Sequence, residues 1–546
     1  MTTSTYETLQ NLASDFWTWR AANQPISSDD IPRIERPDSW IPDWSGEAIE
    51  RRRRELKDFT ARHQEIDTQS WPVAQQVDYR LIGSAIARVH WELNITRGQE
   101  RNPGFYVDQT LGALFLSLLP PPPFTERRSR DIIRYLRSFP NTVTDAKENL
   151  AGNAIKPFAL AALEKLVAVK SRLTKVGTEL GPLLSGVSPQ EFNEAVRAAI
   201  AALESFHDWL NQQLDRMTEE TAVGRDAYVY FLQHVALIPF TPEQLLVMGA
   251  HEWERSVAFE AFEQTRNQGL PDLELFPDQA TQMAQEEFWE GAARRFLEAK
   301  NILTVPGWMN HYRNLPLPAY VEPLSFMGVT DDLTSDTRLD QDGVSYIKQP
   351  SSDLDYFSLS IAKDPRPLIV HEGVPGHYFQ MALSWAHENT IRRRYYDSGA
   401  NEGIGFYAEE MMLQFGFFDD RPKLREIMYN FMRLRALRVE VDVKLATGEF
   451  TIDEAADYLE NIVPVDRSTA RQEAVFFASS PGQAITYQIG KLQIMKFLAD
   501  ARLHQKEQFN LRVFQDYLWK NGNVPIALLR WEYLELSDEI GLLNGS

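Results

Sequence analysis

The chain has 546 residues, of which 43% are hydrophobic, so it can bury a large core. It contains no cysteine, which excludes disulfide frameworks, cysteine nucleophiles and thiolate metal sites and leaves His, Asp and Glu as candidate metal ligands. The 77 acidic and 56 basic residues give a net charge of −21, which disfavours nucleic acid and anionic membranes as partners.

The beginning of the chain, MTTSTYETLQNLASDFWTWRAANQP, lacks the features of a secretory signal. It has no basic segment followed by an apolar run, and no stretch of 18 uncharged apolar residues occurs elsewhere in the sequence. These patterns predict a cytoplasmic protein that does not span a membrane.

Apolar residues recur every three or four positions along most of the chain, as in EFNEAVRAAIAALESFHDWL and KLREIMYNFMRLRALRVEVDVKL. This period predicts amphipathic helices. Two of the predicted helices begin after residues that favour N-caps, Thr241 and Thr451. The four prolines from Pro120 to Pro123 predict a turn, because each removes a backbone donor and disfavours helix in the preceding residue.

Strict alternation of apolar and polar residues is scarce, and the best strand candidate runs from Val344 to Ile347. It lies in a region rich in Pro, Gly, Asp and Ser, from Pro306 to Pro367, which predicts functional loops or short strands. No repeat or flexible linker divides the chain. We predict one mainly helical unit with two lobes, in which residues 1–230 cover the cleft of a catalytic lobe formed by residues 231–546.

An apolar run leads directly into His371 and Glu372, and a second histidine, His377, follows six positions after the first. In an H-E-x-x-H helix the two histidines lie four positions apart and bind one zinc ion, while the glutamate reaches its water. On a regular helix with roughly 100° per residue, a separation of six turns the second imidazole about 120° away. Pro375 and Gly376 stand where a break in the helix would bring both imidazoles to one ion.

A catalytic zinc site typically has three protein ligands and an open position for water, so a third ligand is needed. In the segment NEGIGFYAEE, Glu402 follows His377 by 25 positions, and Glu409 lies seven positions further on the same helix face. We predict that Glu402 is the third ligand and that Glu409 orients a ligating histidine. The alternative is a solvated acidic helix start, which the helix dipole also favours.

Three segments, HE-x-x-PGH, EG-x-x-x-YAE and SPGQAITYQIGKLQI, together resemble the bacterial family catalogued as domain of unknown function eight-eight-five. Looser matches such as GRDAYVYFLQHVALIPFTPEQLLVMG extend the resemblance over most of the chain from about residue 100. The family is regarded as zincin-like metallopeptidases, distantly similar to angiotensin-converting-type dipeptidases. The resemblance therefore implies a large two-lobed helical zincin-like (gluzincin) fold with a deep central cleft and at most a small β-sheet.

The resemblance also implies one Zn²⁺ ion per chain, held by His371, His377 and Glu402. It implies Glu372 as the general base and places the segment from Pro481 to Gly490 in the active-site wall. In that segment, Tyr487 is a candidate donor to the oxyanion of a tetrahedral intermediate. The alternative for Tyr487 is an aromatic side chain packed on an amphipathic helix. Fe²⁺ is not excluded, because the same ligand set can hold ferrous iron.

The sequence departs from the family pattern at three places. A second histidine often follows the PGH, where this chain has Tyr378, and a tryptophan usually follows the EG, where it has Ile404. The family's Asp-x-Gly-x-His stretch begins at Asp442 and ends at Ala446 here, without the glycine or the histidine. These departures favour an alternative function, a non-proteolytic metalloenzyme acting on a small molecule in a biosynthetic pathway.

Our leading prediction is a zinc hydrolase that cleaves an amide bond in a small peptide or amino-acid conjugate, with Glu372 activating the attacking water. A catalytically silent binding protein is a third hypothesis, which the retention of Glu372 beside both histidines disfavours. The sequence has no G-x-S-x-G motif, Walker A loop or dinucleotide fingerprint, so common serine, phosphate and nicotinamide chemistries are disfavoured.

Other charged motifs are interpreted as structural. His251-Glu252 and His387-Glu388 repeat the His-Glu dipeptide, but neither has a second histidine nearby, which is typical of an ordinary surface or helix-packing pair. Arg438 and Asp442 lie four positions apart, which predicts a salt bridge on one helix face. The run ERRRR, residues 50–54, predicts a solvated face of an otherwise acidic protein.

Overall fold

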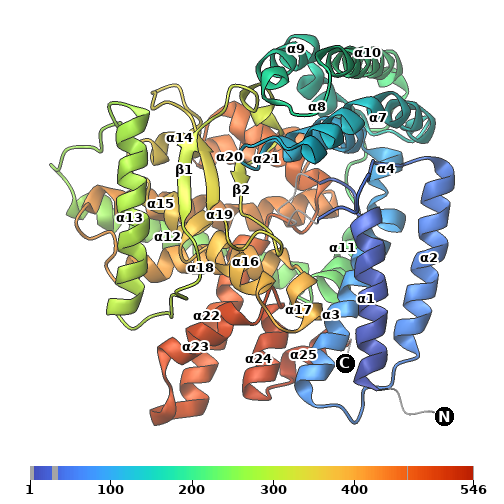
Figure 1. Cartoon of the computed structure of the whole chain (residues 1–546). Helices are drawn as coiled ribbons and strands as arrows, with labels where there is room; N and C mark the ends of the chain where they lie inside the picture. Colours follow the sequence, from blue (N-terminus) through green and yellow to red (C-terminus); the bar gives the residue numbers. More distant parts are fainter. Residues whose placement is uncertain (1–4, 28–34, 464, 545–546) are drawn as a thin grey trace.

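The computed structural model describes residues 5–27, 35–463 and 465–544. Within these ranges the protein is mainly helical, with one small three-stranded sheet, which confirms the predicted fold class (Figure 1). None of the described helices has both the length and the low polarity that a membrane span requires.

The first part of the chain forms two groups of helices. Helices α1–α3 stand together along one edge of the molecule, and α7–α10 lie above them (blue and teal in Figure 1). The α-helices of this part are α1 Tyr6–Asn23, α2 Gly46–Gln64, α3 Val73–His90, α4 Gly98–Arg101, α5 Pro103–Val107, α6 Ala113–Leu118, α7 Glu126–Leu150, α8 Lys156–Leu166, α9 Val169–Leu180, α10 Pro189–Gln213 and α11 Arg225–Tyr230. Short π or 3-10 segments are η1 Trp91–Thr96, η2 Asp108–Gly112, η3 Gly181–Leu183, η4 Leu214–Arg216 and η5 Phe231–Val235.

The second part carries the sheet and the HExxPGH motif. Long helices pack in pairs, α12 against α19 and α18 against α22. The α-helices are α12 Pro242–Arg266, α13 Gln279–Ala299, α14 Tyr356–Ile361, α15 Arg366–Leu368, α16 His377–Trp385, α17 Thr390–Arg394, α18 Ser398–Gln414, α19 Pro422–Thr447, α20 Ile452–Ile462, α21 Arg467–Ser479, α22 Thr486–Gln505, α23 Leu511–Lys520, α24 Ile526–Leu534 and α25 Asp538–Leu543. The strands and shorter segments are β1 Tyr312–Pro316, β2 Asp331–Asp332, β3 Gly343–Ile347, η6 Glu322–Met327, η7 Ile369–Gly373 and η8 Lys506–Gln508.

The sheet has the strand order β1-β3-β2, with β1 parallel and β2 antiparallel to the central strand β3. All five residues of β3 are buried, and this strand contains the predicted segment from Val344 to Ile347. Helix α13 covers the free edge of β1, where Glu286 accepts a hydrogen bond from the backbone amide of Asn314 at 3.0 Å. A carboxylate thereby occupies a donor that another strand would otherwise pair with.

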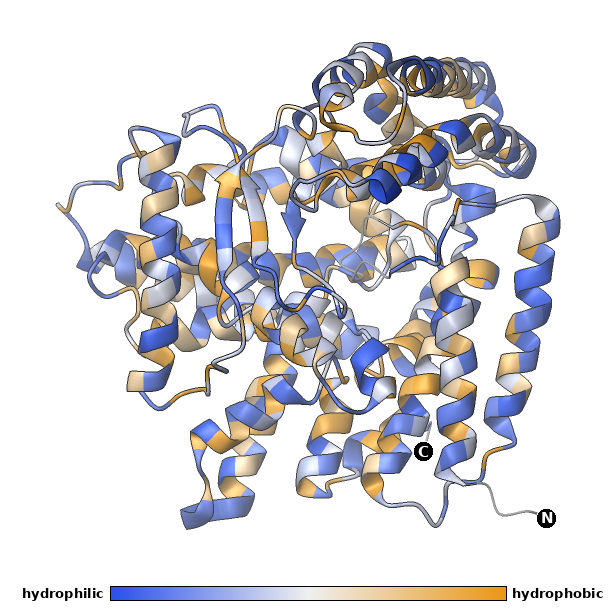
Figure 2. Ribbon diagram, viewed as in Figure 1, coloured by the Kyte–Doolittle hydropathy of each residue, from blue (hydrophilic) through white to orange (hydrophobic). Residues whose placement is uncertain are grey.

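Local sequence signals account for several element boundaries. Thr241 and Thr451 each form a capping box at the start of α12 and α20, as predicted. The prolines from Pro120 to Pro123 fall between α6 and α7, outside any helix. Most helices carry both hydrophobic and hydrophilic residues along their length (Figure 2). The largest cluster of buried hydrophobic side chains extends from Leu9 to Leu543 and so includes residues of both predicted lobes. The division at residue 230 stays a prediction.

The ERRRR run on α2 is not a uniformly solvated face. Arg54 is exposed, but Arg52 is only 4% exposed, so the prediction was wrong at Arg52. The helix turns Arg52 toward its neighbours, where its Nε donates to Asn23 Oδ1 at 3.0 Å and its guanidinium lies 4.2 Å from the centre of the Trp44 ring. A run of four arginines covers every side of a helix, and one of them therefore faces inward.

Candidate metal centre

The HExxPGH segment forms two consecutive helices with a break between them. The π-helical segment η7 ends at Gly373, and α16 begins at His377. In the break, a Cβ atom added to Gly376 would lie 1.8 Å from the carbonyl oxygen of His371, so glycine is required by the close approach of the backbone. Trp519 donates from Nε1 to the carbonyl oxygen of Pro375 at 2.7 Å and so anchors the break. The interruption that the sequence predicts is present.

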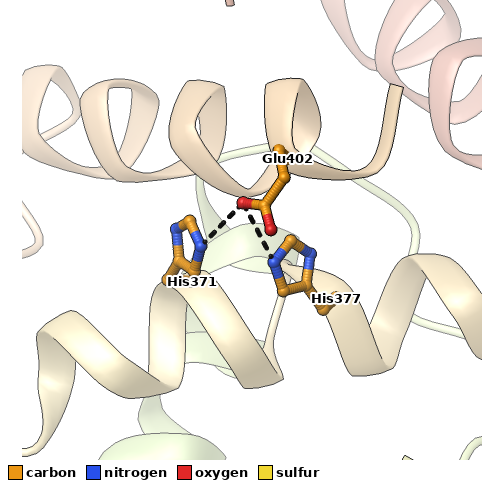
Figure 3. A group of neighbouring side chains, drawn as sticks. All are labelled: His371, His377 and Glu402. Atoms are coloured by element: carbon orange, nitrogen blue, oxygen red, sulfur yellow. Dashed lines mark ion pairs between the residues drawn. The ribbon is translucent and has the colours of Figure 1, made fainter. Parts of the chain in front are cut away.

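The break brings both imidazoles to one carboxylate (Figure 3). His371 comes from η7, His377 is the first residue of α16, and Glu402 projects toward them from α18. The Nε2 atoms of the two histidines lie 3.3 and 3.4 Å from Glu402 Oε2. All three side chains are buried. The structure thus brings together the three residues that the sequence predicts as ligands.

The geometry of this cluster fits a divalent metal ion. One ligand atom from each side chain lies within 4.8 Å of the others. Two ligand atoms about 2.0–2.1 Å from a tetrahedral ion are about 3.3–3.4 Å apart, which matches both distances to Glu402. Glu402 Oε2 is buried without a hydrogen-bond partner among the described residues, which is unusual for a carboxylate unless an ion satisfies it. Two imidazoles and one carboxylate form a donor set that suits zinc.

Gly405 leaves room for the imidazoles against α18. A Cβ atom at this position would lie 2.9 Å from Cε1 of His377 and 3.1 Å from Cε1 of His371. Gly405 lies three positions after Glu402, on the same face of the helix. A side chain there would therefore push both rings away from the carboxylate.

Glu409 and Arg435 hold His371 from its other side. Glu409 Oε1 lies 2.6 Å from His371 Nδ1 and 3.0 Å from Arg435 Nη2. Burial and Arg435 lower the pKa of His371, but the carboxylates of Glu402 and Glu409 outweigh them and raise it to about 10. Burial raises the pKa of Glu402, but both imidazoles hold it well below its usual range. The cluster therefore favours positive charge between the two carboxylates.

Replacing Glu409 with glutamine should weaken metal binding about 10- to 100-fold without removing a ligand. The amide is a poorer acceptor for the Nδ1 proton and leaves His371 less firmly oriented. Competition with a chelator of known affinity measures the change. The control is Glu254→Gln on α12. This side chain is 67% exposed and pairs with His251, which is not part of the cluster. Equal metal affinity in Glu409→Gln and the control would mean that Glu409 does not orient the histidine.

The two predicted catalytic residues lie beside the ligands. Glu372 Oε2 is 4.0 Å from His377 Nε2, and its side chain is 22% exposed. The ring of Tyr487 lies nearly parallel to that of His371, with 6.2 Å between their centres. Helix α22 carries Tyr487 close to α18 because Gly490 and Gly403 meet there, and a Cβ on Gly403 would lie 2.7 Å from the Gly490 Cα.

A cavity of about 600 Å³ opens beside the cluster. Its volume falls within the range of small-molecule sites, about 300–1,000 Å³. The wall includes Glu372, Tyr487 and the three candidate ligands. The segment Gln24–Ser27 and residues Asp108 and Phe115 also line it, so N-terminal segments contribute to the cavity that the sequence predicts they cover.

Arg438 and Asp442 do not form the salt bridge that their spacing predicts. Arg438 pairs with Glu473 instead. Asp442 accepts hydrogen bonds from backbone amides of the loop before α22: Gly482, Ala484 and Ile485. Burial raises the pKa of Asp442 to about 6 despite these bonds. The i,i+4 pattern was misleading because both side chains have closer partners on other elements, and Asp442 fixes the loop that leads to Tyr487.

Sequence analysis did not single out Arg435 as part of the site. It occurs in the run MRLRALRVEV of α19, among apolar residues, and is buried. A charged residue among apolar helix positions needs a partner if it is buried, and this pattern could have indicated that Arg435 has a role in the site. That Glu409 is its partner could not be predicted from the sequence, because the pairing depends on how the two helices pack.

The three departures from the family pattern lie away from the cavity. Tyr378 packs with its ring against Gly343 of β3, and Ile404 and Ala446 belong to buried hydrophobic clusters. None of the three is among the described residues that line the cavity. None of these three side chains therefore contributes to the described cavity wall.

One known protein family matches most of the sequence. The model of the family described as "bacterial protein of unknown function (DUF885)" matches residues 30–286 and 343–532. The chain belongs to this family. The membership confirms the family resemblance, whereas the likeness to angiotensin-converting-type dipeptidases stays a prediction.

Two solved structures share the fold of this DUF885 member. A protein described as a lipoprotein of unknown function from Shewanella oneidensis has 16% identity and a TM-score of 0.72, over 97% of this chain and 100% of that one. A protein described as a lipoprotein from Colwellia psychrerythraea has 17% identity and a TM-score of 0.75, over the full length of both. Identities this low show a common fold and nothing further.

No curated protein matches the chain at a significant level. A protein described as an oligoendopeptidase F from Bacillus anthracis str. Ames has 13% identity over 90% of this chain and 94% of that one. Its TM-score of 0.33 is too low to support any inference.

The cytoplasmic location expected from the sequence stays a prediction.

Proposed function

We propose that this chain is a metal-dependent hydrolase that cleaves an amide bond in a small peptide or amino-acid conjugate. The observation that carries the proposal is the convergence of His371, His377 and Glu402 on one buried point that lines a cavity. Glu372 lines the same cavity, within 4.0 Å of one of the imidazoles. Ligands and base thus meet where a substrate has room to bind.

Zinc, when bound at this point, would polarise the amide carbonyl and make water more acidic. Glu372 would accept a proton as the water oxygen bonds to the carbonyl carbon, and would then return it to the nitrogen as the C–N bond breaks. Its position supports this role, because the side chain is accessible from the cavity while the neighbouring ligands are buried.

Tyr487 is the proposed donor to the developing oxyanion. Its ring lies on the same side of the site as His371 and lines the cavity. The guanidinium of Arg438 lies 4.8 Å from the ring centre, and the ion pair with Glu473 holds Arg438 in place. A phenol fixed in this way can donate where negative charge develops, with little reorganisation during the reaction.

The location of the family departures supports hydrolysis over the non-proteolytic alternative. That alternative was motivated by Tyr378, Ile404 and Ala446, and these residues pack in the core and not around the cavity. The ligands, the base and the tyrosine are all retained around the cavity. These are the residues that the proposed hydrolysis uses.

The metal-loaded protein should hydrolyse di- and tripeptides, and denatured casein should be a poor substrate. A cavity of about 600 Å³ suits a ligand of drug size, which is much smaller than a denatured protein chain. Release of new amino groups, compared at equal concentrations of peptide bonds, measures the preference. We expect it to be at least about tenfold in favour of small peptides, because the cavity has the volume of a small-molecule site. Rapid cleavage of casein at many internal sites would contradict a site limited to small substrates, and inactivity on every peptide would favour the non-proteolytic alternative.

A further inference from the structure

A second, smaller cavity of about 140 Å³ lies next to the one that contains the metal cluster. The two share part of their walls, the segment Gln24–Ser27 and Asp108. The rest of its wall includes residues of α1–α3, of η1, α4 and α5, of η5, of the start of α18 and of the loop before α22. It contains no candidate ligand of the metal centre, so it calls for an explanation of its own.

Arg52 lines this cavity with part of its guanidinium unsatisfied. The residue is 4% exposed, and its Nη1 atom is buried with no hydrogen-bond partner among the described residues. One contact is polar, from Nε to Asn23 Oδ1, and another is the stacking of the guanidinium on Trp44. Burial lowers the pKa of Arg52 to about 10, and Asp43 offsets this only in part. A buried cation without a paired anion is unfavourable, which suggests that a partner is supplied from outside the chain.

The other charges around the cavity do not neutralise Arg52. Arg20 is occupied by Glu92 in a two-pronged contact of 2.8 and 2.5 Å. Asp108 faces Lys165, at 3.6 Å. Of the three arginines in the cavity wall, Arg20 is therefore the one with a direct carboxylate partner among the described residues.

Arg88 lines the same cavity and makes no hydrogen bond or ion pair with any described residue. Its charge acts on Asp397, which also lines the cavity and whose pKa is raised by burial to about 6. Asp397 is itself engaged as the N-cap of α18, where it accepts from the amide of Ala400. The cavity therefore has two guanidinium groups that no carboxylate of the described residues contacts.

We propose that this cavity binds a small oxyanion, a carboxylate or phosphate group, between Arg52 and Arg88. A guanidinium presents planar paired donors that match the oxygens of such groups. Polar side chains of Gln483 and Thr486 face the same space and offer further hydrogen bonds. The volume admits the anionic group and a few attached atoms. The anion is either free or the charged end of a ligand that extends from the larger cavity across the shared wall.

Calorimetric titration of the metal-loaded protein with inorganic phosphate and with acetate tests the site without any turnover. Arg52→Gln should weaken the binding of either anion at least tenfold, and Arg52→Lys should be intermediate, because it keeps the charge but loses the paired donors. The matched control is Arg54→Gln, on the same helix and exposed, which should bind as the wild type does. The proposal is overturned if neither anion binds the wild type at 10 mM, or if Arg52→Gln binds both as tightly as the wild type.

Arg88→Gln provides a second variant in case the loss of Arg52 disturbs folding, since Arg88 is only partly buried. It should also weaken anion binding at least tenfold while leaving the circular dichroism spectrum unchanged; unchanged binding would overturn the proposal. Succinate distinguishes the two sources of the anion. If succinate binds tenfold more tightly than acetate, and does so only when metal is present, one ligand extends from the metal to the arginines. If succinate and acetate bind equally, the site takes a free anion. Because these are binding measurements, their failure is distinct from a failure of hydrolysis.

Discussion

Replacing Glu372 with glutamine should lower kcat about 10²- to 10⁴-fold while the metal content and the folded state are retained. The amide has nearly the shape of the carboxylate but cannot accept the proton from the attacking water. Glu372 is partly exposed and is not one of the three clustered ligands, so its loss leaves no ligand missing. Steady-state kinetics on the best small-peptide substrate, together with metal analysis of the same sample, measure both parts of the prediction.

The chain offers a matched control for this substitution in the His-Glu dipeptide on the exposed segment after α16. Glu388 follows His387 just as Glu372 follows His371, but Glu388 is exposed and has no second histidine nearby. Glu388→Gln should leave kcat and KM unchanged. Near-normal turnover in Glu372→Gln would remove this glutamate from the mechanism, and loss of metal from it would assign Glu372 to the metal site instead.

Replacing Gly376 with alanine should reduce metal affinity by more than the roughly 10- to 100-fold that outer contacts of a metal site contribute. The new Cβ would lie 1.8 Å from the carbonyl oxygen of His371, and backbone must move to admit it. Either the turn carrying His371 or the start of α16 carrying His377 is displaced, so the two imidazoles no longer face one point. Overpacking of this kind also costs about 1–3 kcal/mol of stability. Chelator competition and thermal unfolding measure the two effects.

Gly307→Ala is the control for Gly376→Ala, because nothing lies within 4 Å of a Cβ added at Gly307. It should keep both metal affinity and melting temperature close to those of the wild type. Retention of wild-type metal affinity in Gly376→Ala would show that the ligands do not depend on the shape of this break.

The sequence was sufficient for the helical class and for the local geometry of the motif. The 3.6-residue period and capping residues such as Thr241 are local properties of the sequence, and the structure confirms the helices and the cap that they predict. The break before His377 was also predictable, because six residues of regular helix cannot bring two imidazoles to one ion and proline and glycine stand between them. These predictions needed no knowledge of how distant segments meet.

Contacts between distant elements could not be predicted in the same way. The i,i+4 spacing of Arg438 and Asp442 suggested a mutual pair, but each finds a closer partner on another helix or loop. The ERRRR run was predicted to be solvated from its high charge alone. The prediction did not take into account which side of the helix each arginine lies on, and Arg52 lies on the buried side. The pairing of Arg435 with Glu409 likewise depends on where α19 and α18 meet. Such errors arise wherever tertiary packing decides which face of a helix is buried.

Metal analysis of the purified protein, prepared without added metal, tests the central claim most directly. We predict zinc near one ion per chain in the wild type, and a loss of most of this zinc when His377, one of the three clustered side chains, is replaced with alanine. Iron in place of zinc would contradict the hydrolytic assignment, and zinc retained in His377→Ala would contradict the site itself.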